Sequence, residues 1–210
     1  CYIGKGKSRT VSWLPGKDAE FGEKMKTIED MKLELLSDNS SKFMQTLIDY
    51  DIKSKDKYGS NLLHYYIMNY DSIVHPAGVI ISEFIKKGLD INDKRKDGRT
   101  ALYLSVQCQL QDIFEILLNS NADLDIQNVN GNTPLWEAVM RYRGDGFFIE
   151  QLLKNGANPD IKNNYGVSPK SLARTIANYD VRRFFNNDNK QQTDWTSGTL
   201  PNINRWEKYE

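Results

Sequence analysis

Residues 128–138 read Asn-Val-Asn-Gly-Asn-Thr-Pro-Leu-Trp-Glu-Ala, and this segment combines the signals for a tight turn and for the start of a helix. Gly131 suits a turn position with positive φ, which glycine adopts without steric cost. Thr133 is suited to cap a helix through its hydroxyl group, and Pro134 fits the first helical position, where its missing N–H is not needed. The segment therefore predicts a turn followed at once by a helix.

The same combination recurs along the chain. Turn glycines stand 39, 33 and 35 residues apart, at Gly59, Gly98, Gly131 and Gly166. Each is followed by a four-residue helix start: Asn61-Leu62-Leu63-His64, Thr100-Ala101-Leu102-Tyr103, Thr133-Pro134-Leu135-Trp136 and Ser168-Pro169-Lys170-Ser171. A period near 33 with a Thr-Pro-Leu-His-like helix start is typical of ankyrin repeats. The sequence therefore resembles an ankyrin-repeat protein over residues 26–187.

The resemblance implies an all-α ankyrin-repeat solenoid, in which helix-turn-helix repeats with β-turn fingers stack side by side. The third copy matches best, whereas Leu62 replaces the proline of the first copy and Ser171 the histidine of the fourth. The predicted organisation is an extended tether over residues 1–23, a repeat domain over 24–187 and a tail over 188–210. The repeat domain has room for about four to five repeats, caps included.

Terminal repeats are expected to be atypical, because one side of each meets water. Residues 24–50 predict a helix pair that caps the stack, and residues 181–185 predict a last short helix. Apolar residues at helical spacing predict the inward sides of the capping pair. They are Met25, Ile28, Met31, Leu33, Leu35 and Leu36 in the first helix, and Phe43, Leu47 and Ile48 in the second. In the second repeat, Ile113, Ile116, Leu117 and Leu118 predict a buried helix side.

Two repeats are longer than the standard length. The first has extra residues at 70–76 and the third at 143–146, in each case between its two helices. An insertion there maps to a loop on one face of the stack, which is often a functional face. The alternative is a neutral extension without contacts.

The composition excludes several classes of protein. The chain has 210 residues, with 28 Lys and Arg against 28 Asp and Glu, so the formal net charge is zero and nucleic acid is not an expected partner. No apolar run approaches the length of a membrane span. Cys1 and Cys108 are the only cysteines, which excludes a disulfide framework.

Cys1 suggests one route to a membrane. A chain that begins on Cys and continues with Gly, Ser and Lys residues resembles a bacterial lipoprotein after removal of its signal peptide. The resemblance implies acyl chains on Cys1 and a periplasmic, membrane-anchored protein. The alternative is that the chain begins on Cys by chance and is cytoplasmic.

No set of residues predicts catalysis, and the sequence predicts neither a cofactor nor a metal site. His64 falls on the histidine of the repeat motif, which the family uses for hydrogen bonds between repeats, and His75 has no carboxylate or Cys partner by spacing. Cys108 is expected to be a small, partly buried hydrophobic residue. An enzyme with an unrecognised site is the remaining alternative.

The resemblance also implies a binding surface. In the ankyrin family, variable binding positions flank the repeat glycine and end the first helix. The matching positions predict partner-binding residues at Lys57, Tyr58, Lys96, Asp97, Arg99, Gln107, Val129, Asn130, Asn132, Met140, Arg141, Asn164 and Tyr165, with Ser60, Met68, Asn69, Cys108 and Val167 beside them. Tyr, Arg and Met are enriched at the centres of protein interfaces.

A protein partner is therefore expected. A lipoprotein-like ankyrin stack resembles bacterial immunity proteins that neutralise toxic effector enzymes, including phospholipases delivered by type VI secretion. The alternative is an intracellular scaffold or adaptor. Trp195 and Trp206 in the tail predict either packing against the last repeat or contact with a partner.

Overall fold

The computed structural model describes residues 26–176 and 180–186, and over these ranges the regular structure is helical. The predicted all-α ankyrin solenoid is confirmed. The described helices are α1 Ile28–Leu35, α2 Ser40–Ile48, α3 Leu62–Met68, α4 Ala77–Lys86, α5 Ala101–Cys108, α6 Gln111–Asn119, α7 Pro134–Arg141, α8 Phe147–Lys154 and α9 Pro169–Thr175, with short 3₁₀ helices η1 Tyr70–Ser72 and η2 Val181–Phe185. The predicted tether and tail lie outside the described residues.

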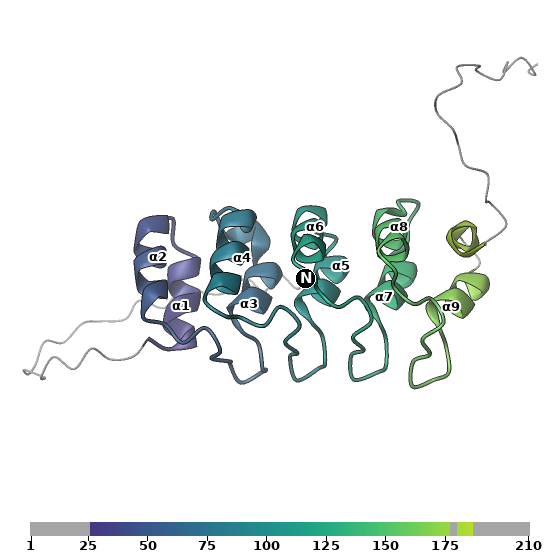
Figure 1. The fold of residues 1–210 in the computed structure, drawn as a ribbon, viewed down its shortest axis with the longest axis horizontal. Coiled ribbons are helices and arrows are strands. Elements are labelled where there is room, and N and C mark those ends of the chain that lie inside the picture. The colour runs from purple at the N-terminus through teal and green to yellow at the C-terminus, as the bar shows by residue number, and fades with distance from the viewer. Residues whose placement is uncertain (1–25, 177–179, 187–210) are drawn as a thin grey trace, which may run out of the picture.

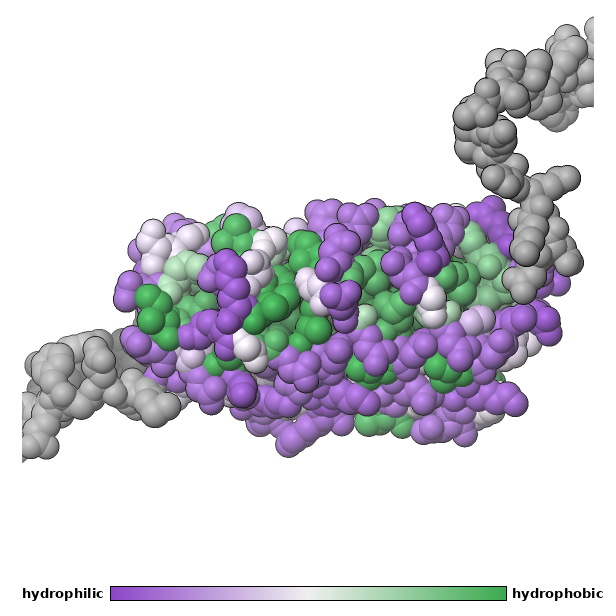
Figure 2. Space-filling model, in the orientation of Figure 1, coloured by the Kyte–Doolittle hydropathy of each residue, from purple (hydrophilic) through white to green (hydrophobic). Residues whose placement is uncertain are grey.

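The helices form two rows. Helices α1, α3, α5, α7 and α9 stack in one row, each against the next, and α2, α4, α6 and α8 form the other row (Figure 1). Four loops, which we call fingers, project beyond the first row and precede α3, α5, α7 and α9 (Figure 1). Figure 2 shows that the finger edge of this view is largely hydrophilic, whereas hydrophobic residues gather over the helices. No helix among the described residues is long and apolar enough to cross a membrane.

The helices of the first row begin where the sequence predicts. Thr133 accepts a hydrogen bond from Trp136 N, and Pro134 occupies the first turn of α7. Thr100 caps α5 in the same way, and Ser168 caps α9. Each cap satisfies an N–H that has no partner within its helix. The repeated motif is therefore a repeated helix start.

One continuous hydrophobic core runs between the two rows. Leu117 of α6 is fully buried, as predicted, together with Ile113. In the N-terminal cap, Ile28, Met31, Leu35, Phe43 and Leu47 are buried as expected. Leu33, Leu36 and Ile48 are instead exposed, so their assignment to the inward sides is wrong. Leu33 and Ile48 lie on the solvent-facing sides of α1 and α2, and Leu36 follows the last residue of α1.

The fingers are tied to one another through their backbones. Each is closed by two backbone hydrogen bonds, as between Asn128 N and Asn132 O at 3.0 Å and between Gly131 N and Asn128 O at 2.9 Å. Neighbouring fingers are joined by Lys96 N to Tyr58 O, Val129 N to Asp97 O and Asn164 N to Asn130 O, at 2.9–3.1 Å. The row of fingers is therefore held as one rigid edge.

The insertion in the first repeat packs inward through His75. Its ring is buried, stacks on Phe43 at 5.3 Å between centroids, and lies 2.7 Å from Ser40 Oγ through Nδ1. Tyr66 donates its hydroxyl proton to the His75 carbonyl at 2.6 Å. These contacts come from α2 and α3, and none of them is with a carboxylate or a Cys. Through His75 the insertion therefore packs against α2 and α3.

His64 links the first two fingers, as the family resemblance implies. Asn61 N donates to His64 Nδ1 at 3.2 Å, so Nδ1 carries no proton and Nε2 carries the proton that reaches the Asp93 carbonyl at 3.1 Å. Burial lowers the pKa of His64 from its ordinary 6.5 to about 4. The folded protein therefore requires the neutral ring.

The lowered pKa of His64 predicts that the protein loses stability in acid. Because the unfolded chain binds a proton on His64 at a higher pH than the folded chain, the contribution of His64 is complete above pH 6.5 and is lost as the pH falls towards 4. The loss is expected to approach ~1.4 kcal/mol per pH unit within that window. Urea unfolding of the wild type and of His64→Gln, which retains an acceptor for Asn61 N, measures it. Equal pH slopes in the two proteins would exclude His64 as the cause.

Candidate protein-binding face

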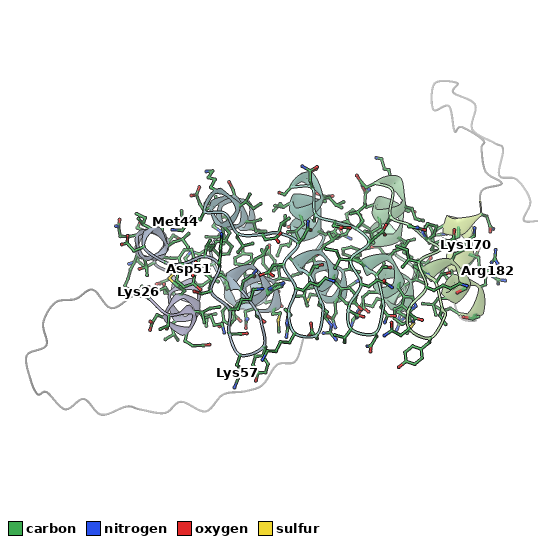
Figure 3. The ribbon with its side chains drawn as sticks, turned by 60° about the horizontal axis from the view of Figure 1, so that its bottom comes forward. Lys26, Met44, Asp51, Lys57, Lys170 and Arg182 are labelled. Carbon is green, nitrogen blue, oxygen red and sulfur yellow. The ribbon has the colours of Figure 1, made fainter. Side chains whose placement is uncertain are left out.

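The predicted binding positions fall on one side of the molecule. We define the finger–helix face as the tips of the four fingers and the exposed sides of α3, α5 and α7. Figure 3 places Lys57 at the tip of the first finger. The finger–helix face extends along the whole stack, because each repeat contributes one finger and one helix.

Most of the predicted residues are exposed on this face. Tyr165 is 79% exposed, Val129 59%, Tyr58 56% and Met140 42%. Apolar and aromatic groups in such positions are typical of interface centres. The remaining exposed positions are Lys57, Lys96, Asn130, Arg141 and Asn164, and the half-buried ones are Asp97, Arg99 and Gln107.

Two of the predicted positions are not available to a partner. Asn132 is buried: its Oδ1 accepts from Asn163 Nδ2 at 2.8 Å, and its N–H donates to Asn128 Oδ1 at 3.0 Å. Ser60 is also buried, and its N–H donates to Asp56 Oδ1 at 2.9 Å. The residue after each repeat glycine turns inward at these two fingers to close the turn. The prediction that their side chains are exposed is wrong.

A hydrogen-bonded network that sequence reasoning missed lies beneath the centre of the face. The Tyr103 hydroxyl donates to Glu137 Oε2 at 2.9 Å and accepts from Asn128 Nδ2 at 3.1 Å. Arg141 Nε pairs with Glu137 Oε1 at 2.5 Å. Burial, and then the Glu137 carboxylate, raise the pKa of Tyr103, which keeps its proton. Tyr103 stands at the position of the motif histidine. This departure from the motif was the signal in the sequence that could have pointed to the network.

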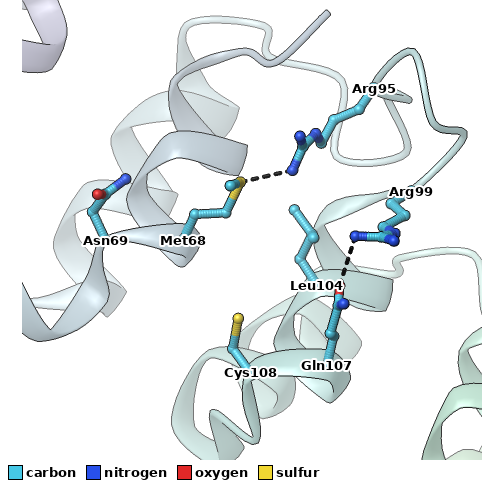
Figure 4. Close-up of a pocket in the computed structure, with 7 residues that line it drawn as sticks. All are labelled: Met68, Asn69, Arg95, Arg99, Leu104, Gln107 and Cys108. Atoms are coloured by element: carbon cyan, nitrogen blue, oxygen red, sulfur yellow. Dashed lines mark hydrogen bonds between the residues drawn. The ribbon is translucent and has the colours of Figure 1, made fainter. Parts of the chain in front are cut away.

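A pocket opens between α3 and α5 on the same face. It encloses about 230 Å³ and is lined by Met68, Asn69, Arg95, Arg99, Leu104, Gln107 and Cys108 (Figure 4). Arg95 Nη1 donates to Met68 Sδ at 2.7 Å, and Arg99 Nη1 donates to Gln107 Oε1 at 3.2 Å. Five of these residues are at or beside the predicted binding positions, namely Met68, Asn69, Arg99, Gln107 and Cys108. Arg95 and Leu104 are not.

The Cys108 thiol in the pocket is poorly suited to act as a nucleophile. Burial raises the pKa of the Cys108 thiol, which disfavours the thiolate needed for nucleophilic attack. Among the described residues, no group of three or more His, Cys, Asp or Glu side chains is placed to hold a metal ion. Cys1, the predicted lipidation site, lies outside the described residues.

The family model for ankyrin repeats matches two overlapping segments, residues 33–128 and 77–163, as three copies. Together they cover more than half of the 210-residue chain. The chain belongs to the ankyrin-repeat family. Its repeats make it a protein–protein interaction module, and the expected class of partner is a protein.

Segments similar to this chain occur within larger proteins of several organisms. The ankyrin repeat protein OPG189 of Variola virus is 32% identical over 121 residues, which are 56% of this chain and 21% of that protein. The neurogenic locus notch homolog protein 1 of Mus musculus is 36% identical over 103 residues, 48% of this chain and 4% of that protein. An intracellular phospholipase A2 of Caenorhabditis elegans is 24% identical over 85% of this chain and 17% of its own length. This ankyrin-repeat chain thus spans about a fifth or less of each.

Proposed function

We propose that this ankyrin-repeat protein is a non-catalytic binding module that engages its protein partner through the finger–helix face. The observation that carries the proposal is the exposure of Tyr58, Val129, Met140 and Tyr165 on a face whose fingers are joined by backbone hydrogen bonds. Aromatic side chains have few rotatable bonds, so they bind with little loss of conformational freedom. The partner is held along the stack rather than in a single cavity.

Removal of three exposed side chains tests the proposal. The triple variant Tyr58→Ala, Met140→Ala and Tyr165→Ala is expected to weaken partner binding by at least about tenfold, because a few central aromatic residues carry most of the energy of an interface. All three are exposed, so the thermal unfolding midpoint is expected to stay unchanged. Calorimetry with the captured partner measures the affinity.

A matched triple variant provides the control. Ile48→Ala, Val79→Ala and Ile85→Ala also removes exposed apolar side chains, but from α2 and α4 in the other row of helices. Its affinity is expected to equal that of the wild type. A loss of binding in this variant, with none in the first, would move the interface to the second row.

Partner capture from the native organism separates two narrower forms of the proposal. One is inhibition of a toxic effector enzyme, in which the finger–helix face covers a surface that the effector needs. The other is a scaffold or adaptor that joins several proteins. One stoichiometric enzyme whose activity falls on adding this chain supports inhibition, whereas several unrelated proteins bound without any loss of activity support the scaffold.

A further inference from the structure

The pocket between α3 and α5 contains two arginines whose charges are incompletely neutralised. Arg95 and Arg99 share the single carboxylate of Asp97, at 3.6 and 3.9 Å, so one positive charge remains. Both Nε atoms are buried and have no hydrogen-bond partner. A buried donor without an acceptor costs free energy, so the two guanidinium groups are incompletely hydrogen-bonded.

One Nη donor of each arginine has a neutral acceptor. Arg95 donates to the thioether of Met68, which is a weak acceptor, and Arg99 donates to the neutral amide of Gln107 (Figure 4). A carboxylate is a stronger acceptor, and guanidinium groups bind it through two parallel hydrogen bonds. The pocket is therefore short of negative charge.

Arg95 departs from the pattern of the other fingers. Asp56, Asn128 and Asn163 occupy the equivalent position, and each accepts two backbone N–H groups of its own finger through a side-chain oxygen. An arginine has no acceptor and cannot close the finger in this way. In the second finger Asp97 accepts from Arg99 N at 3.1 Å instead. The Arg95 side chain is thus released from the structural role and lines the pocket.

The size of the pocket favours a side chain over a metabolite. Its volume of about 230 Å³ is below the ~300–1,000 Å³ of typical small-molecule sites. Met68 and Leu104 give it apolar walls beside the guanidinium groups. An acidic side chain with an aliphatic stem matches both the walls and the charge.

We propose that this pocket receives an Asp or Glu side chain of the protein partner, whose carboxylate pairs with Arg95 and Arg99. The inference rests on the proposed function and identifies the recognition chemistry at the centre of the finger–helix face. The pairing fixes the register of the partner along the stack, because the second finger alone places an arginine at this position.

A first test needs no partner. N-acetyl-glutamate N-methylamide is titrated against the whole chain while the Nε–H signals of the arginines are followed by nuclear magnetic resonance, with signals assigned from Arg95→Lys and Arg99→Lys. Saturable shifts confined to Arg95 and Arg99 are expected at millimolar concentration, and none with the glutamine analogue. Equal shifts in all arginines, including exposed Arg174, or no shift at all, would overturn the proposal.

A second test uses the captured partner. Arg95→Gln with Arg99→Gln is expected to weaken binding at least tenfold, whereas the matched Arg174→Gln has no effect, and all variants keep the wild-type unfolding midpoint. Charge exchange, with Arg95→Glu in this chain and Arg in place of the acidic residue of the partner, restores binding. If the Tyr58, Met140 and Tyr165 triple variant loses affinity but the arginine variant does not, the face binds the partner and the pocket does not. If neither loses affinity, the proposed function itself fails.

Discussion

Leu117→Ala is expected to lower the free energy of unfolding by ~2–5 kcal/mol, the range for leucines removed from protein cores. Leu117 is fully buried in α6, in the core between the two rows of helices. Truncation loses apolar burial and leaves a cavity that the surrounding helices fill only in part. Urea unfolding followed by circular dichroism measures the change.

Leu33→Ala is the matched control for this substitution. Leu33 is also helical but is 71% exposed, so the same chemical change is expected to cost less than ~0.5 kcal/mol. Similar losses in the two variants would show that α6 does not face the core as described. The comparison also tests the correction made to the N-terminal cap.

Gly131→Ala is the second substitution with a large expected effect, of ~2–5 kcal/mol. Gly131 has φ of +77°, a conformation that costs an L-residue ~1–2 kcal/mol. An added Cβ would also lie 2.7 Å from Asn164 N and 2.9 Å from Asn163 Cα in the next finger. Relief of that overlap requires a backbone shift, which adds ~1–3 kcal/mol.

Gly166→Ala isolates the contact between fingers. Gly166 has nearly the same φ, +76°, but no described atom lies within 4 Å of its added Cβ. The change in the unfolded chain is the same for both substitutions, so the difference between them, ~1–3 kcal/mol, reports the close approach alone. Equal melting temperatures for the two variants would contradict the packing of the third finger against the fourth.

The repeat register was predictable because its signals are local. Turn glycines, Thr or Ser caps and a proline at the first helical position act within a few residues, and Thr133 with Pro134 begins α7 as expected. The fourth copy also begins its helix at Pro169, although its motif is degenerate. Cap chemistry survives the loss of the consensus histidine, since Ser171 completes a capping box with Ser168.

The orientation of single side chains was less predictable. Leu33 and Ile48 are apolar, yet which side of an end helix is covered depends on whether another repeat follows, and this is not a local property. The family resemblance predicts Asn132 as a partner-binding residue, but its side chain is buried and accepts a hydrogen bond from Asn163 Nδ2 of the next finger. Such pairings join residues about one repeat apart.

The location of the candidate site was predictable from the sequence, but the side-chain interactions within it were not. Most of the positions around each repeat glycine and at the end of each first helix are exposed on the finger–helix face, whereas Ser60 and Asn132 are buried. The pairing of Arg95 and Arg99 with Asp97 depends on side-chain directions within the second finger, and that of Tyr103 with Glu137 on side-chain directions between adjacent repeats. Comparison of the four finger positions would have identified Arg95 as the exception.

Site-specific photo-crosslinking tests the central claim, that the finger–helix face binds the protein partner. A photoreactive phenylalanine is placed at Val129 or Met140 on that face, or at Glu115 or Lys154 on α6 and α8, all of which are exposed. Irradiation in the presence of the partner is expected to yield covalent complexes from Val129 and Met140 alone. Complexes formed only from Glu115 and Lys154 would contradict the claim and place the partner on the row of helices that contains α6 and α8.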